Sequence, residues 1–340
     1  MLKLGLVRPA HLDRPRTWYG ARKFPSLYLL RDLRRDGAAN ATRHDDILRL
    51  LQMANGTWKE TRRGRFEGLD RDLVGLLLET HPRGGSLIVT DLAVSSGVTS
   101  VELYRALSTV FRPDFLATDL WRDAIAFRRI GRPWSVVLDF RGEVVQYVLG
   151  PFVLPGFSSE LPLYPINALL RFLARLFLLP GARRLLPSEQ IDRCRDFDHV
   201  SASGYDVMRL PLLSADTLDL MEAQHRFRFE VADVLEPMKR PADLIRAMNI
   251  LTPLHMPAPA LRHAARNCLA NLNPGGIFVI GRSVSDDPDL TRATVYRRDD
   301  GALVPVRRLN GGAEIERLVE EEWRHCAQVK TVGSPGVTPA

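Results

Sequence analysis

The chain has 340 residues, a net charge of +7 and charged and hydrophobic fractions of 26% and 45%, which are ordinary for a globular protein large enough for more than one domain. Its three cysteines are far apart, so we expect neither a disulfide framework nor a zinc site. The N-terminus has no apparent signal peptide, and no apolar run approaches the roughly 20 residues that span a bilayer. We therefore expect a cytoplasmic protein, soluble or peripheral to a membrane.

The N-terminal region is basic and has helical spacing. Residues 1–66 hold fifteen Lys and Arg against six Asp and Glu. Apolar periodicity predicts helices over 25–37, 42–54 and 69–79. Such a basic block suits an anionic lipid surface, an acidic substrate or nucleic acid, or it forms a solvated helical face; no nucleic-acid-binding motif accompanies it. We expect a basic helical cap over residues 1–80 and no nucleic-acid partner.

The stretch 86–102, SLIVTDLAVSSGVTSVE, has the pattern of a nucleotide-binding strand, loop and helix. The β-branched run at its start suits a buried strand, and Asp91 closes that strand. Small residues then follow at every second position: Ala93, Ser95 and Gly97. Small side chains let a ligand lie against the backbone, and the helix that begins beyond them aims its N-terminal N–H groups at the loop.

The spacing of this loop separates two ligand classes. A dinucleotide fingerprint requires a third glycine, where this chain has Val98. The next strand, 115–119, ends in Asp119, 22 positions past Gly97. This is close to the interval of about 20 residues at which an acidic side chain meets an adenosine ribose. The alternatives remain that the loop is an ordinary tight turn and that Asp119 caps the next helix.

An insertion interrupts the regular pattern after the second strand. Residues 135–138 and 143–148 are typical of a hairpin, and a Pro-rich segment follows. The apolar stretch Ile166–Leu179 carries Arg171 and Arg175 on one face. It is too short to span a bilayer, and it suits either a lid helix packed on the domain or a helix lying along an anionic membrane surface. We expect the insertion, residues 121–204, to determine substrate specificity.

The remaining elements are typical of an α/β sheet. A strand over 226–233 ends in Asp233, and further strands are expected over 242–251 and 277–280. Helices are expected over 260–272 and 314–322, and a hairpin is expected from 294–298 with 303–307. The tail, residues 331–340, is rich in Gly, Pro, Ser and Thr and is expected to be disordered. The Asp286–Asp289 segment with Pro288 is typical of a turn and cap, so we expect no metal site.

In this order the motifs resemble those of class I S-adenosylmethionine-dependent methyltransferases. The segments DLIRAMNIL at 243–251 and LNPGGIFVIGR at 272–282 are similar to those of chemotaxis-receptor carboxyl methyltransferases. The resemblance implies an α/β fold with a doubly wound, mostly parallel seven-stranded sheet. The resemblance covers residues 86–119 and 226–310. Together with the residue patterns above, it leads us to expect a methyltransferase domain over residues 81–330, with a helical N-terminal cap and an apolar insertion after the second strand.

The resemblance also implies residue roles around S-adenosyl-L-methionine. Asp91 and the backbone of residues 93–97 would face the methionine portion, and Asp119 would bind the ribose. Asp233 would accept a hydrogen bond from the adenine amino group. Asn249 would lie beside the sulfonium and the acceptor atom. The implied cofactor site therefore consists of the following residues: Asp91, Ala93, Ser95, Gly97, Asp119, Asp233 and Asn249.

Two neighbours of Asn249 bear on the chemistry. Met248 stands where the chemotaxis enzymes have Arg, which weakens the case for a glutamyl side chain as substrate. His255, six residues past Asn249, is the candidate base if the acceptor is a hydroxyl, with an ordinary loop histidine as the alternative. No NPPY-type motif follows Asn249, which argues against methylation of amino groups on nucleic-acid bases.

These observations favour an enzyme that transfers a methyl group from S-adenosylmethionine to an oxygen, or less favourably a nitrogen, of a hydrophobic or anionic small molecule. The alternative is a non-catalytic or membrane-peripheral binding protein that keeps a degenerate cofactor fold. A nicotinamide oxidoreductase ranks third because of Val98. The sequence does not indicate an oligomeric state.

Overall fold

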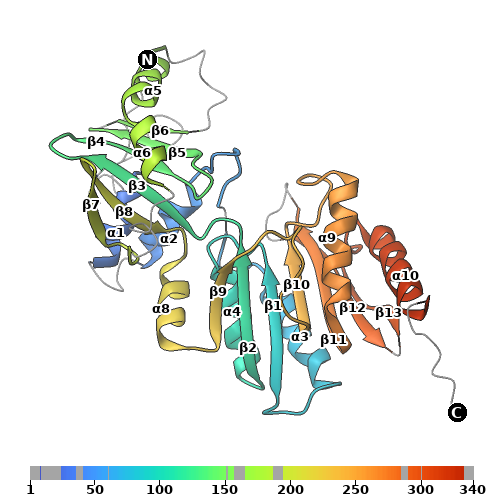
Figure 1. The fold of residues 1–340 in the computed structure, drawn as a ribbon. Helices are drawn as coiled ribbons and strands as arrows, with labels where there is room; N and C mark the ends of the chain where they lie inside the picture. Colours follow the sequence, from blue (N-terminus) through green and yellow to red (C-terminus); the bar gives the residue numbers. More distant parts are fainter. Residues whose placement is uncertain are drawn as a thin grey trace, which may run out of the picture. The chain divides into compact units, whose positions relative to one another are not determined.

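The computed structural model describes residue 8 and residues 24–35, 41–59, 61–150, 152–156, 165–186, 194–284, 290–299 and 301–332. The chain forms two compact units, which Figure 1 shows coloured along the sequence. The parallel-sheet unit comprises residues 62–120 and 220–340, and the antiparallel unit comprises residues 1–61 and 121–219. The sequence therefore passes between the units three times.

The parallel-sheet unit contains seven strands. They are β1 (Ser86–Leu92), β2 (Arg112–Asp119), β9 (Phe227–Val231), β10 (Ala242–Met248), β11 (Leu272–Ser283), β12 (Thr291–Asp299) and β13 (Ala302–Leu309). Their order in the sheet is β13-β12-β11-β10-β1-β2-β9. The five strands from β11 to β9 are parallel, and β12 pairs antiparallel with both β11 and β13. The predicted mostly parallel seven-stranded sheet is confirmed.

Helices cover both faces of this sheet. On β10, Ile245 and Ala247 belong to the hydrophobic cluster formed with α9 (Ala258–Ala270) and α10 (Glu316–Val332). Arg246, between them, points the other way and bonds to α3 (Glu67–Leu78) and to the start of α4 (Val98–Ser108). Because successive side chains of a strand alternate between faces, the sheet is doubly wound, as the sequence predicted.

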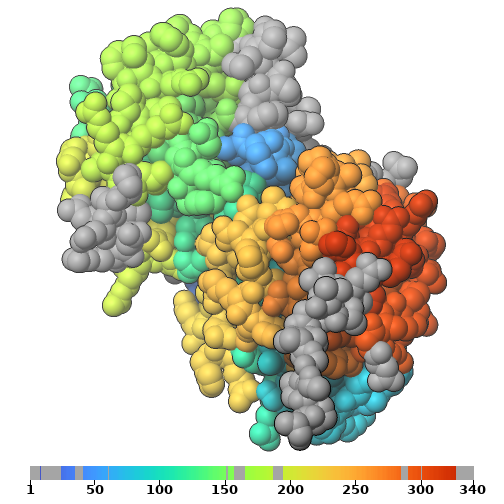
Figure 2. Space-filling model, turned by 45° about the vertical axis from the view of Figure 1, so that its right-hand side comes forward, coloured from blue at the N-terminus to red at the C-terminus, as the bar shows by residue number. Residues whose placement is uncertain are grey.

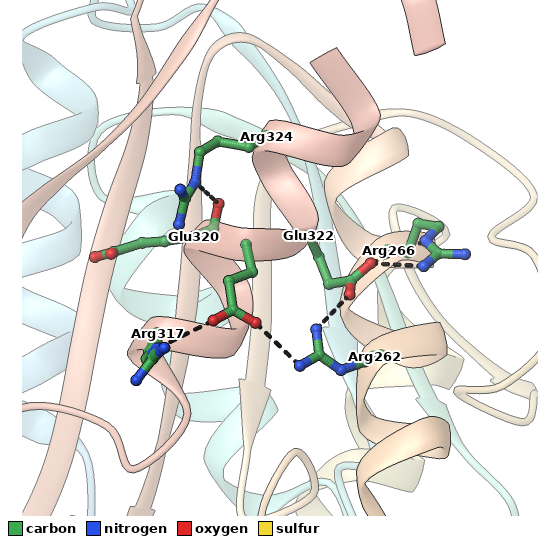
Figure 3. A network of polar contacts seen from close by, with 7 residues as sticks. Arg262, Arg266, Arg317, Glu320, Glu322 and Arg324 are labelled. Carbon is green, nitrogen blue, oxygen red and sulfur yellow. Dashed lines mark hydrogen bonds and ion pairs between the residues drawn. The ribbon is translucent and has the colours of Figure 1, made fainter. Parts of the chain in front are cut away.

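Ion pairs link α9 to α10 (Figure 3). Arg266 donates two hydrogen bonds to Glu322, at 2.7 and 3.0 Å, and Arg262 reaches Glu322 and Glu321 at 2.9 and 3.0 Å. Burial raises the pKa of Glu322, but the hydrogen bonds from Arg262 and Arg266 outweigh it and leave that pKa below its ordinary value. The arginines are almost half-exposed, so this network lies at the rim of the helix pair.

The antiparallel unit is built on a second sheet. Its strands are β3 (Asp123–Arg129), β4 (Trp134–Leu138), β5 (Val144–Leu149), β6 (Phe152–Pro155), β7 (His199–Ala202) and β8 (Tyr205–Pro211). The order is β6-β5-β4-β3-β8-β7, and every pair is antiparallel. Its helices are α1 (Tyr28–Arg35), α2 (Ala41–Arg49), α5 (Pro165–Phe177) and α6 (Leu179–Leu185), and α8 (Ala215–Ala223) leads into the other unit.

Both faces of this second sheet are buried. On β3, Ala124 and Ala126 belong to a cluster with the leucines of α1 and α2, whereas Ile125 and Phe127 belong to a cluster with α5 and α6. Gln146 ties the N-terminal segment to the sheet, because its Oε1 accepts from the N–H of Leu27 at 2.8 Å. The unit thus has three layers, helices, sheet and helices.

The unit boundaries differ from those expected. The helices predicted over 25–37 and 42–54 form, but they pack on the sheet of residues 121–219, so only residues 62–80 of the predicted cap join the parallel-sheet unit. The predicted hairpin over 135–148 forms as β4 and β5, and four further strands surround it. The difference has a physical cause: the leucines of α1 and α2 complete the core of a sheet that one layer of helices leaves half uncovered. Of the predicted disordered tail, residues 333–340 lie outside the described residues.

Candidate functional site

The predicted site residues follow the ends of neighbouring parallel strands. Asp91 and Asp119 lie at the carboxyl ends of β1 and β2, Asp233 follows β9 by two residues, and Asn249 follows β10 directly. In the sheet these strands are adjacent, in the order β10-β1-β2-β9. Since parallel strands end at one edge, the four residues and the loop 93–97 belong to the same edge, where open α/β sheets bind ligands.

The loop after β1 places every second residue in the left-handed region of backbone space. The φ angle is 55° at Ala93, 60° at Ser95 and 82° at Gly97. This conformation costs roughly 1–2 kcal/mol for a residue with a Cβ atom. The alternate small residues noted in the sequence are therefore the positions at which the loop turns. α4 begins at Val98, so its N-terminal N–H groups follow directly.

Two hydrogen bonds fasten this loop to the end of β2. The N–H of Val94 donates to the carbonyl of Thr118 at 3.0 Å, and the N–H of Ser95 donates to Oδ2 of Asp119 at 2.7 Å. Asp119 is buried, with 7% of its surface exposed. Its carboxylate therefore holds the loop in place, whereas its contact with a ribose stays a prediction.

Asp233 and Asn249 each stabilise the turn that follows a strand. Oδ1 of Asp233 accepts from the N–H of Leu235 at 3.0 Å. Asn249 has a φ of 61°, donates its N–H to the carbonyl of Gly281 and accepts the N–H of Ser283 on Oδ1, both at 2.8 Å. Asparagine enters the left-handed region more readily than most residues. The roles toward adenine and toward the acceptor atom stay predictions.

The glycine that receives Asn249 belongs to the motif LNPGGIFVIGR. Gly281 lies in β11, where a Cβ atom would come within 2.7 Å of Ala293 on β12. A larger residue would push the two strands apart and shift the carbonyl that holds Asn249. The motif thus fixes the edge of the sheet around the predicted acceptor position. His255 lies on the exposed turn between β10 and α9, and its role as a base stays a prediction.

A buried ion cluster supports the first loop from within. Arg246 is 1% exposed and makes a two-pronged contact with Asp91, from Nε to Oδ1 at 2.9 Å and from Nη2 to Oδ2 at 2.6 Å. Ser100 also donates to Oδ2 of Asp91, at 2.6 Å. Both oxygens of Asp91, which the resemblance directs toward methionine, therefore accept hydrogen bonds from the protein.

The same guanidinium reaches α3 and α4. Its Nη1 donates to Oδ1 of Asp70 at 2.8 Å, and its Nη2 donates to the carbonyl of Thr99 at 3.0 Å. The ring of Phe66 lies 5.7 Å from the guanidinium carbon. Arg246 therefore joins β1, β10, α3 and the first turn of α4, and so anchors the elements on both sides of the loop.

The cluster has perturbed protonation equilibria. Burial raises the pKa of Asp70 to about 7, although the charge of Arg246 opposes the shift. Burial lowers the pKa of Arg246, but Asp91 and Asp70 raise it by more, so the guanidinium stays charged. Protonation of Asp70 near neutral pH changes the net charge of the cluster by one.

Sequence reasoning missed this cluster. The signal in the sequence was Arg246 itself, a charged residue between Ile245 and Ala247 within a strand that is mostly apolar. Such a residue requires a buried partner, because an unpaired charge in the core is costly. The partner Asp70 could not be identified, since it lies on a helix 176 positions away.

The site residues fit S-adenosylmethionine in part. The small, left-handed residues of the loop let a ligand approach its backbone closely. Asp119 ends β2, where the resemblance places the ribose, and one of its two oxygens already accepts the N–H of Ser95. Asp91 fits less well, because Arg246 and Ser100 already bond to both of its oxygens. The loop 93–97 and Asp119 are thus the residues available to a cofactor, Asp91 supports them, and their contacts with the cofactor stay predictions.

Comparison with known proteins gives structural likeness alone. No protein-family model and no curated protein matches the sequence. Among solved structures, the chain is similar to an S-adenosylmethionine-dependent methyltransferase from Clostridium acetobutylicum ATCC 824, with 12% identity, 76% of this chain and 79% of that chain covered, and a TM-score of 0.34.

Two further solved structures are similar to the chain. For the N-methyltransferase NodS from Bradyrhizobium japonicum WM9 in complex with S-adenosyl-L-homocysteine, identity is 12%, coverage is 66% of this chain and 65% of that chain, and the TM-score is 0.27. For the [4+2]-cyclase SpnF, identity is 14%, coverage is 75% of this chain and 55% of that chain, and the TM-score is 0.30. Likeness at this level does not indicate the activity of this chain.

Proposed function

We propose that this chain binds S-adenosyl-L-methionine at the carboxyl edge of its parallel sheet and transfers the methyl group to an oxygen of a hydrophobic or anionic small molecule. Nitrogen is the less favoured acceptor. The observation that carries the proposal is the loop 93–97, whose alternate residues are left-handed and whose Ser95 N–H is bonded to Asp119. The family resemblance of the motifs supports the same reading.

Each group at the edge has a defined duty in this proposal. The loop backbone and Asp119 hold the cofactor, which supplies an electrophilic methyl group when bound. Displacement at that group depends chiefly on alignment of the acceptor. Asn249, fixed by hydrogen bonds to β11, is rigid enough to position an acceptor, and His255 would take the proton of a hydroxyl.

The connectivity of the chain bears on which part of it could select the acceptor. The chain leaves the parallel sheet directly after Asp119 and enters the antiparallel unit at Trp121. The inserted unit is therefore connected in sequence directly to the strand end that carries Asp119, which supports a part for this unit in acceptor selection. The absence of an NPPY-type motif after Asn249 argues against nucleic-acid bases as acceptors.

The proposal is tested by calorimetric titration with S-adenosyl-L-homocysteine. Asp119→Asn keeps the shape of the side chain but removes one acceptor oxygen, and we expect a loss in binding free energy of about 1–3 kcal/mol. Asp299→Asn, on the hairpin of β12 and β13, is the matched control and should bind as the parent does. Equal affinity for the parent and Asp119→Asn would move the ribose contact elsewhere.

One observation favours a second candidate, a non-catalytic binding protein. The carboxylate of Asp91 is committed to Arg246 and Ser100, which would weaken its contact with the methionine portion. The two candidates differ in turnover. Incubation with S-adenosylmethionine labelled in its methyl group and a set of small hydroxylated and carboxylated acceptors should give labelled product if the chain is an enzyme. Tight binding of the cofactor without labelled product from any acceptor would favour the second candidate.

A further inference from the structure

The helix α5 presents two different faces. Toward the antiparallel sheet it buries Asn167, Ala174 and, just beyond its end, Leu178. Ala174 and Leu178 belong to the cluster that contains Phe127 and Tyr147. Leu170 packs against the same cluster and is partly buried. The buried side of α5 thus carries few large apolar side chains, which is unusual for a helix that completes a core.

The opposite face of α5 is apolar and exposed. Six large apolar side chains have between 39% and 62% of their surface exposed: Ile166, Leu169, Phe172, Leu173, Leu176 and Phe177. Figure 2 shows the yellow-green residues of this region at the surface. A lid helix would bury the same side chains, but the described residues leave them exposed to this extent. A contiguous exposed patch of this kind marks an interaction site.

The charge of the segment indicates its partner. Residues 165–186 contain four arginines and no acidic residue. Arg175 and Arg184 are exposed, while Arg183 donates to the carbonyl of Gly142 at 2.9 Å and so ties α6 to the β4–β5 turn. Apolar side chains flanked by arginines are complementary to a surface that offers hydrocarbon beneath phosphate.

The geometry suits a helix that lies along such a surface. α5 has 13 residues and is therefore about 20 Å long. No described helix is by itself long and apolar enough to cross a membrane; α5 and α6 meet that condition of length and composition together, but a bend of 46° separates them. At the junction, Gly181 lies so close to the ring of Tyr205 that a Cβ atom would collide with it, which fixes α6 against the sheet.

We propose that the exposed face of α5, with Arg175 and Arg184 beside it, docks the protein on the surface of an anionic lipid membrane. The apolar side chains enter the boundary between headgroups and acyl chains, and the arginines contact lipid phosphates. This proposal does not depend on cofactor binding or methyl transfer, because it concerns the exposed face of α5 and not the edge of the parallel sheet.

The test is flotation of the full chain with vesicles of phosphatidylcholine alone or mixed with phosphatidylglycerol. We expect binding to the anionic vesicles that weakens as salt rises. Arg175→Ala with Arg184→Ala should weaken that binding roughly 30-fold, at about one kcal/mol per arginine. Phe172→Ser with Phe177→Ser should abolish it without lowering the melting temperature, because both rings are exposed.

Matched controls come from another exposed part of the same unit. Arg129→Ala with Arg132→Ala removes two exposed charges from the β3–β4 turn, and Ile130→Ala removes an exposed apolar side chain there; neither should change vesicle binding. The proposal is overturned if vesicles do not bind the chain, or if binding is equal on neutral vesicles and indifferent to the arginines. It is also overturned if Phe172→Ser with Phe177→Ser instead converts an oligomer to a monomer in sedimentation, since a second copy would then be the occupant.

Discussion

The parallel-sheet unit holds two charge networks that differ in almost every respect. The network of α9 and α10 joins two arginines that are almost half-exposed to Glu321 and to Glu322, whose own side chain is buried (Figure 3). The cluster around Arg246 is fully buried and joins two carboxylates to one guanidinium. Exposed pairs contribute little because water screens them, whereas a buried charge that loses its partner is costly. We therefore expect the free energy of unfolding to respond more to a broken pair in the buried cluster than to a broken pair in the network of α9 and α10.

The largest effect is expected when the buried cluster loses its cation. Arg246→Met leaves Asp70 and Asp91 buried without a positive partner, so we expect a loss of about 3–5 kcal/mol in the free energy of unfolding. Urea unfolding at pH 8 measures it. Adding Asp70→Asn and Asp91→Asn to this variant should restore part of the loss. A loss below about 1 kcal/mol for Arg246→Met would mean that water reaches the cluster.

The pH dependence of stability should come next in size. The pKa of Asp70 is raised from 3.8 to about 7, so between these values the folded state binds more protons than the unfolded chain. Its free energy of unfolding therefore falls as pH rises through this window. We expect the parent to lose roughly 2–4 kcal/mol relative to Asp70→Asn between about pH 4.5 and 7.5.

Urea unfolding at a series of pH values checks this expectation. Below pH 7, the free energy of unfolding should change with pH more steeply for the parent than for Asp70→Asn. Above pH 7, the two should change with pH in the same way. Two curves that run parallel throughout would show that Arg246 keeps Asp70 ionised in the fold at every pH measured, and would reduce the cluster to an ordinary ion pair.

The smallest effect is expected in the network of α9 and α10, whose arginines are almost half-exposed although Glu322 is buried. Arg266→Gln removes one of two arginines on Glu322, and Arg262 keeps the other contact. We expect a loss below about 1 kcal/mol that disappears near 1 M salt. Thermal unfolding at low and high salt measures it. A loss as large as that of Arg246→Met would erase the distinction between the two networks.

Much of the parallel-sheet unit could be predicted from sequence. Four of its strands are short apolar runs that end at acids or turn residues: β1, β2, β10 and β11. Such runs can be recognised in a sequence because both faces of a parallel strand are buried. Less of the antiparallel unit could be predicted. β3 also has a continuous apolar run, residues 124–127, which is typical of a strand buried on both faces, but nothing in that run shows that α1 lies on one side of it and α5 on the other.

The site could be predicted as positions and not as contacts. The loop spacing located Ala93, Ser95 and Gly97, and the structure adds that these are its left-handed residues. The bond from Ser95 to Asp119 and the pairing of Asp91 with Arg246 could not be read from the sequence, because each joins segments that only the sheet register brings together.

The most direct test of the account is a comparison of ligands on the intact chain. At about 100 times its dissociation constant, S-adenosyl-L-homocysteine should raise the free energy of unfolding by roughly 2.7 kcal/mol and raise the melting temperature accordingly, and NAD should leave both unchanged. Stabilisation by NAD in its place, or no response to either ligand at saturating concentration, would contradict the assignment of the loop 93–97 and Asp119 to an S-adenosylmethionine site.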